Sequence, residues 1–176
     1  MAPVYEPRMQ RIFVIGDSIS MQYGPHLESF LRGKFHYDRK RGSTGNLDSG
    51  EGANGGDSRK VLGYLRERLA ARDLPADVLI VNCGLHDIKV NPGARGCQVP
   101  LLEYEANLRA IVAEARTAGL GVVWIRTTPI IDEIHNSRQS DFRRFSADVA
   151  RYARVRRCLV CVCVLRYQPM ESSEIS

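Results

Sequence analysis

The chain has 176 residues, of which 44% are hydrophobic and 26% charged, and its formal net charge is +5. This composition indicates a single soluble globular domain over residues 1–176. No apolar run is long enough to cross a membrane, and residues 1–10 lack the apolar core of a signal peptide, so we expect a cytoplasmic protein without membrane contact. An odd number of cysteines, five, argues against a complete disulfide framework.

The basic residues are unevenly distributed, and one segment contains seven arginines: Arg138, Arg143, Arg144, Arg151, Arg154, Arg156 and Arg157. The segment has no motif of nucleic-acid recognition. We therefore interpret it as a solvated helix face and expect no nucleic-acid partner.

The first predicted element is a short buried strand, because Ile12 to Ile15 are four consecutive apolar residues. Gly16-Asp17-Ser18 follows, and apolar residues at helical spacing continue from Ile19 to Leu31. Ser18 is thus expected where a strand ends and a helix begins, a place that favours an oxyanion. It is a candidate nucleophile. The tripeptide alone favours a turn followed by a helix cap.

The next stretch alternates weakly over residues 34–41 and predicts an edge strand. A glycine-rich loop over residues 42–56 is expected either to approach a ligand closely or to be a flexible surface loop, and it matches no nucleotide-binding motif. Asp57-Ser58 predicts a helix cap, and residues 77–82 form the clearest buried strand. That strand leads directly into Gly84-Leu85-His86-Asp87.

The second half repeats this alternation. We expect a loop over residues 91–100, a helix over 101–118 and a strand over 122–125, followed by a loop that contains Asp132 and His135. A helix is predicted to begin at Ser140, and a last buried strand is predicted over residues 158–165. This order of elements predicts an α/β fold: a three-layer α/β/α sandwich with a mainly parallel, flavodoxin-like sheet of about five strands.

Three separated motifs resemble those of the SGNH hydrolases, also called the GDSL-type esterase/lipase family. Gly16-Asp17-Ser18-Ile19 resembles the first block, Gly55-Gly56-Asp57-Ser58 the second, and Gly84-Leu85-His86-Asp87 the third. Their order, spacing and positions at strand ends agree with the family. The resemblance covers about residues 11–155, whereas residues 156–176 are atypical.

The resemblance implies a role for three residues. Ser18 would be the nucleophile, and a glycine N–H of the second block would serve the oxyanion hole, with Gly56 preferred and Gly55 as the alternative. His86 stands where the family usually has an asparagine that donates to the oxyanion. A neutral imidazole also has one N–H and can donate in its place. The alternative is that His86 only braces its loop.

The fifth block of the family, Asp-x-x-His, supplies the catalytic base and lies near the carboxyl terminus, where this sequence does not contain it. Asp132 and His135 have the same spacing but occur one strand earlier. They are therefore either a substitute orienting acid and base or an incidental match.

Two functions remain open at this point. The first is a serine-dependent hydrolase of small carboxylic esters that needs no metal or organic cofactor. The second is a catalytically incomplete binding or scaffold protein that lacks the Asp/His pair. Zinc binding by Cys158, Cys161 and Cys163 is disfavoured, because these residues alternate with apolar ones in the last predicted strand. The oligomeric state does not follow from the sequence.

Overall fold

The sheet is parallel throughout. The computed structural model of the chain describes residues 8–138 and 141–157. Within them four strands are ordered β2-β1-β3-β4: β1 (Arg11–Gly16), β2 (His36–Arg39), β3 (Val78–Asn82) and β4 (Gly121–Trp124). β2 lies at an edge, as the weak alternation of its residues predicts.

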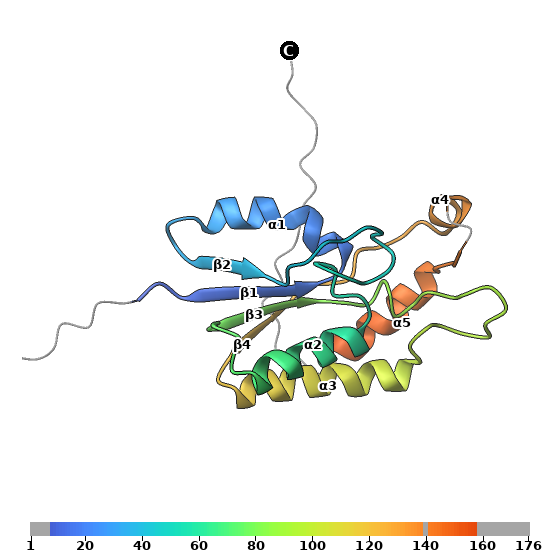
Figure 1. The fold of residues 1–176 in the computed structure, drawn as a ribbon. Coiled ribbons are helices and arrows are strands. Elements are labelled where there is room, and N and C mark those ends of the chain that lie inside the picture. Colours follow the sequence, from blue (N-terminus) through green and yellow to red (C-terminus); the bar gives the residue numbers. More distant parts are fainter. Residues whose placement is uncertain (1–7, 139–140, 158–176) are drawn as a thin grey trace, which may run out of the picture.

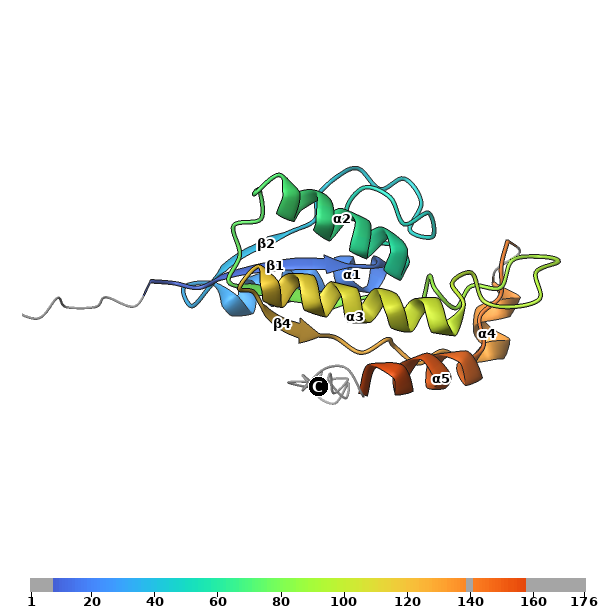
Figure 2. The same cartoon turned by 90° about the horizontal axis from the view of Figure 1, so that it is seen from below.

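Helices cover both faces of the sheet (Figure 1). α1 (Ser18–Leu31) lies on one face, and α2 (Ser58–Ala70) and α3 (Leu101–Thr117) lie on the other. α5 (Ser146–Arg157) packs beside α3, as the view from below shows (Figure 2). The predicted three-layer α/β/α architecture is confirmed, and the expected strand over residues 158–165 lies outside the described residues.

Side chains of β1 and β3 alternate between two apolar clusters, which is why these strands read as continuous apolar runs. The cluster under α1 contains Ile12, Val14, Leu31 and Ile80. The cluster under α2 and α3 includes Phe13, Ile15, Val61, Leu65, Leu79, Val81 and Leu108. Full burial of each such side chain contributes about 1.5–3 kcal/mol, so the two inner strands are the most firmly held part of the sheet.

Aspartates cap the two helices that begin near the carboxyl ends of the strands. Asp17 Oδ1 accepts a hydrogen bond from the Ile19 N–H at 3.0 Å, and Asp57 Oδ1 accepts one from the Lys60 N–H at 3.1 Å. The predicted cap of α2 is therefore confirmed. Each cap contributes about 1 kcal/mol to stability.

The expected loop around Asp132 and His135 is wrong. These residues form a short helix, α4 (Asp132–Ser137), near the carboxyl ends of the strands (Figure 1). Two acidic residues, Asp132 and Glu133, occupy its first turn, where negative charge is favourable.

The helix predicted from Ser140 begins later, at Ser146. The preceding residues instead form an antiparallel bridge, in which Val90 and Arg143 exchange backbone hydrogen bonds of 2.8 and 2.9 Å. The bridge keeps this segment extended and ties it to the loop after β3.

Among the described residues, no helix is long and apolar enough to cross a membrane.

Candidate active site

The predicted site residues come from segments that leave the sheet side by side. β1 and β3 are neighbouring parallel strands, and Gly16 is paired with Asn82 at their carboxyl ends. The segment that contains Ser18 and the segment that contains His86 therefore begin at the same edge of the sheet (Figure 1). In open α/β sheets this edge is where ligands bind.

Ser18 is the first residue of α1 and is half-buried. The neighbouring Asp17 is buried, and its Oδ1 accepts a 2.7 Å hydrogen bond from Asn82 Nδ2. The Tyr23 hydroxyl donates to Asn82 Oδ1 at 3.0 Å. Burial raises the pKa of Asp17 to about 6. This network holds the start of α1 against the end of β3, and the sequence analysis did not assign Asn82 a part in it.

The glycine-rich loop is docked against the end of β1. The Gly55 N–H donates to the Gly16 carbonyl at 2.7 Å, and a Cβ on Gly55 would lie 3.0 Å from that oxygen. The Gly56 N–H donates to the side-chain oxygen of the buried Asn54 at 2.9 Å. Residues 54–56 are therefore a fixed part of the site.

Gly50 brings the second and third motifs together. It has a φ of +67°, and a Cβ at this position would lie 2.7 Å from Gly56 Cα and 3.5 Å from His86 Nδ1. The Cβ position of Gly50 therefore faces both Gly56 and the His86 ring. A residue with a side chain would both clash and adopt an unfavourable backbone conformation.

His86 is 2% exposed, and its Nε2 atom is buried without a hydrogen-bond partner among the described residues. Burial lowers the pKa of His86 to about 3, and the positive charges of Lys89 and Arg144 lower it further. The imidazole is thus neutral at pH 7 and carries one N–H. Beside it, Asp87 Oδ1 accepts a hydrogen bond from the Ser58 N–H at 2.9 Å, and burial raises the pKa of Asp87 to about 7.

The candidate base and its partner are engaged elsewhere. His135 is half-buried, with Nε2 3.4 Å from Arg144 Nη1, and burial and the charge of Arg144 lower its pKa. Asp132 Oδ1 accepts a hydrogen bond from the Ser146 N–H at 2.7 Å, at the start of α5. Within residues 8–138 and 141–157, no hydrogen bond joins Ser18 to a histidine. The roles assigned to His135 and Asp132 remain predictions.

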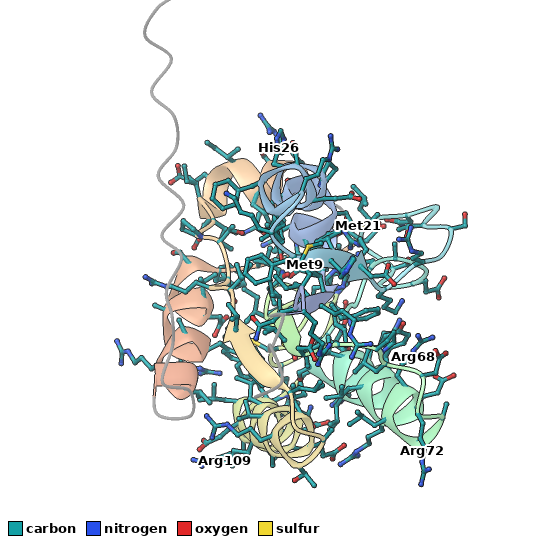
Figure 3. The ribbon with its side chains drawn as sticks, turned by 90° about the vertical axis from the view of Figure 1, so that its left-hand side faces the viewer. Met9, Met21, His26, Arg68, Arg72 and Arg109 are labelled. Carbon is teal, nitrogen blue, oxygen red and sulfur yellow. The ribbon has the colours of Figure 1, made fainter. Side chains whose placement is uncertain are left out.

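The other two histidines are exposed. His26 lies on α1, and Figure 3 shows it on the outer side of that helix, away from the sheet. His36 begins the edge strand β2. His36 is paired with Arg11, at the opposite end of β1 from Gly16.

A buried charged cluster was missed by the sequence analysis. Arg144 is only 6% exposed, so its assignment to a solvated helix face is wrong. Its Nε donates to the Leu85 carbonyl at 2.6 Å, and it shares the carboxylate of Asp48 with the buried Lys89. A single basic residue in an arginine-rich segment gives no sequence signal of burial.

No group of His, Cys, Asp and Glu side chains in the described part of the chain could hold a metal ion, and Cys158, Cys161 and Cys163 lie outside that part.

A comparison with models of protein families identifies the family of this chain. The family model for the GDSL-like Lipase/Acylhydrolase family matches residues 14–172. The α/β/α fold and this match define the class of the protein as a hydrolase. More narrowly, the chain belongs to the GDSL-like lipase/acylhydrolase family. The search of curated protein sequences gave no match.

Solved structures share the fold at low sequence identity. The acetyl xylan esterase AlAXEase is 15% identical with a TM-score of 0.58, over 85% of this chain and 71% of that one. A GDSL-like lipase from Bacteroides thetaiotaomicron is 12% identical with a TM-score of 0.56, over 85% and 63%. The esterase EstA from Pseudoalteromonas sp. is 13% identical with a TM-score of 0.53, over 90% and 77%.

Proposed function

We propose that the protein is a serine-dependent hydrolase of small carboxylic esters, with Ser18 as the nucleophile. One observation carries the proposal: Gly50 lies against both Gly56 and His86, at the sheet edge where α1 begins with Ser18. A nucleophile, a helix N-terminus and two candidate oxyanion donors thus come from three separate segments. Membership of a hydrolase family supports the same reaction.

The reaction proceeds in two steps. Ser18 Oγ forms a bond to the ester carbonyl carbon while its proton passes to a base, and the alkoxide then leaves with that proton. Water attacks the acyl-enzyme, and Ser18 regains its proton as the acid is released. The oxyanion formed in each step is stabilised by hydrogen-bond donors placed beforehand.

Three donors are proposed for this oxyanion hole. The Ser18 N–H makes no hydrogen bond within the described residues, and the neutral His86 ring carries one N–H beside the glycine loop. The Gly56 N–H already donates to Asn54 Oδ1, so it must be shared with the oxyanion or released by rotation of the Asn54 side chain. Loss of one such donor costs about 2.7–4 kcal/mol of transition-state stabilisation.

We assign the base to His135. Its lowered pKa leaves the imidazole neutral at pH 7, and a neutral ring can accept a proton. A specific observation favours the second function, a catalytically incomplete binding or scaffold protein: the carboxylate of Asp132 bonds to Ser146 and does not orient His135.

Hydrolysis of p-nitrophenyl acetate separates the two functions. The assay compares the wild type with Ser18→Ala and His135→Ala, and uses Ser29→Ala and His26→Ala on the exposed side of α1 as matched controls. We expect turnover by the wild type and both controls, and its loss in both site variants with the fold intact. A wild-type rate equal to that of Ser18→Ala would reject the hydrolase and leave the binding protein. Loss in Ser18→Ala alone would reject His135 as the base.

A further inference from the structure

Two buried cations lie beside the candidate oxyanion residue His86. Lys89 is 5% exposed and Arg144 is 6% exposed. Arg144 Nε donates to the carbonyl of Leu85, which fixes the guanidinium one residue away from His86 along the chain. The Lys89 N–H donates to the His86 carbonyl at 3.3 Å. The Arg144 guanidinium is thus tied to the backbone of the third motif, and Lys89 Nζ donates to the Asp48 carbonyl in the glycine-rich loop.

These cations share one carboxylate and one aromatic ring. Asp48 Oδ1 lies 3.8 Å from Lys89 Nζ and 3.4 Å from Arg144 Nη2. The Phe142 ring centroid lies 4.3 Å from Lys89 Nζ and 4.6 Å from Arg144 Cζ. Burying a cation is costly unless an anion compensates it. One carboxylate compensates only half of this charge.

The surrounding charges do not restore the balance. Lys60 acts on Lys89 as a further cation, and Asp57 and Asp17 are the nearby acids. Both carboxylate oxygens of Asp57 accept hydrogen bonds, Oδ1 from the Lys60 N–H and Oδ2 from Gln98 Nε2, and Asp17 caps α1. A positive excess therefore remains around Lys89 and Arg144.

Asp48 shares its carboxylate between the two cations, and its backbone carbonyl also accepts a hydrogen bond from Lys89 Nζ. Its side chain is 31% exposed, and it lies on a turn beside Gly50 in the glycine-rich loop. A carboxylate from outside can therefore compete with Asp48 for the same two cations.

We propose that Lys89 and Arg144 form a subsite for a carboxylate carried by the ester substrate, and that Asp48 occupies this subsite until the substrate replaces it. The guanidinium provides planar donors that match a carboxylate, and the ammonium adds a point charge. The inference rests on the proposed function and narrows its substrate class to acidic monoesters of dicarboxylic acids. The reaction is the same hydrolysis, which yields an alcohol and the second carboxyl group.

The test compares monomethyl succinate, which is anionic at pH 7, with neutral dimethyl succinate. Hydrolysis is monitored as acid release in a pH-stat. The measured quantity is the ratio of kcat/KM for the anionic ester to kcat/KM for the neutral one. We expect this ratio to fall at least about tenfold in Lys89→Gln, because an ionic contact is lost. It should rise severalfold in Asp48→Asn, which removes the competing carboxylate. Arg109→Gln, on the outside of α3 (Figure 3), should leave it unchanged.

A ratio that stays constant in Lys89→Gln and Asp48→Asn overturns the inference. A ratio that falls in Asp48→Asn overturns the replacement of Asp48 by substrate. Because Lys89 is buried, thermal unfolding of each variant is measured, and Asp48→Asn provides the test at a half-exposed position if Lys89→Gln does not fold.

Calorimetry on Ser18→Ala separates this inference from the proposed function. Tighter binding of monomethyl succinate than of dimethyl succinate, lost when Lys89→Gln is added, supports the subsite even where the wild type hydrolyses neither ester. In that case the hydrolase is rejected and the anion site stands. Equal binding of the two esters rejects the subsite, whatever the wild type hydrolyses.

Discussion

Replacing the buried His86 by asparagine should change how the stability of the protein depends on pH. The pKa of His86 is about 3 in the folded protein and 6.5 at its ordinary value, because burial, Lys89 and Arg144 all disfavour the charged ring. Between these two values the unfolded chain binds more protons than the folded one. The contribution of His86 is therefore fully present above pH 6.5 and is lost as the pH falls through that range toward 3.

The size of the effect follows from these two pKa values. Between pH 7 and pH 5 the titration of His86 should lower the free energy of unfolding by about 2 kcal/mol. Asp17 and Asp87 act in the opposite direction. Their raised pKa values, about 6 and 7, mean that their contribution is present at low pH and is lost as the pH rises through those values. Both carboxyl groups remain in His86→Asn, which cannot titrate at position 86.

The measurement is urea unfolding of the wild type and His86→Asn at pH 7 and at pH 5. The wild type should lose about 2 kcal/mol relative to the variant over this change. The free energy of unfolding of the wild type minus that of His86→Asn is compared at the two pH values. A change in this difference of less than about 0.5 kcal/mol would refute a buried imidazole whose charged form is destabilised, since independent effects add only to that accuracy.

Four further substitutions test the packing of the fold and of the site. Gly50→Ala should destabilise the protein by more than about 1 kcal/mol in urea unfolding, because the position has a positive φ and no room for a Cβ. Gly63→Ala, in an open position of α2, should stabilise by about 0.5–1 kcal/mol, and equal effects of the two changes would contradict this account. Asn82→Ala should cost about 1–3 kcal/mol and raise KM or lower kcat, because Asp17 loses its buried donor; an unchanged protein would show that the network is dispensable. Tyr152→Phe should lower the free energy of unfolding by about 1–2 kcal/mol through the loss of a buried hydrogen bond, and a smaller change would indicate that water replaces the hydroxyl.

The parts of the fold that depend on local pattern could be predicted from the sequence. Ile12 to Ile15 and Val78 to Val81 are apolar runs bounded by polar residues, and both belong to inner strands. The helix cap at Asp57 could also be predicted, because its side chain accepts a hydrogen bond from a backbone N–H three residues away. Such features are set by neighbours along the chain.

The features that could not be predicted depend on contacts between distant segments. Asn82 reaches Asp17 only because β1 and β3 are parallel in one particular register. Arg144 is buried because the bridge between Val90 and Arg143 draws its segment toward the loop after β3. The helix α4 has only six residues, too few to show a helical period. The position of the charged cluster was therefore hidden, although each of its residues is plain in the sequence.

The strand order also determines when the amino-terminal part of the chain can become stable during synthesis. β1 is an inner strand, and one of its two partners, β3, lies at Val78–Asn82, far along the chain. At about 5–20 residues per second, several seconds pass between the emergence of the two strands from the ribosome. During that time one side of an apolar strand has no partner, a condition that favours binding by a chaperone. Slower translation before β3 should therefore lower the yield of folded protein, whereas slower translation after β4 should have less effect.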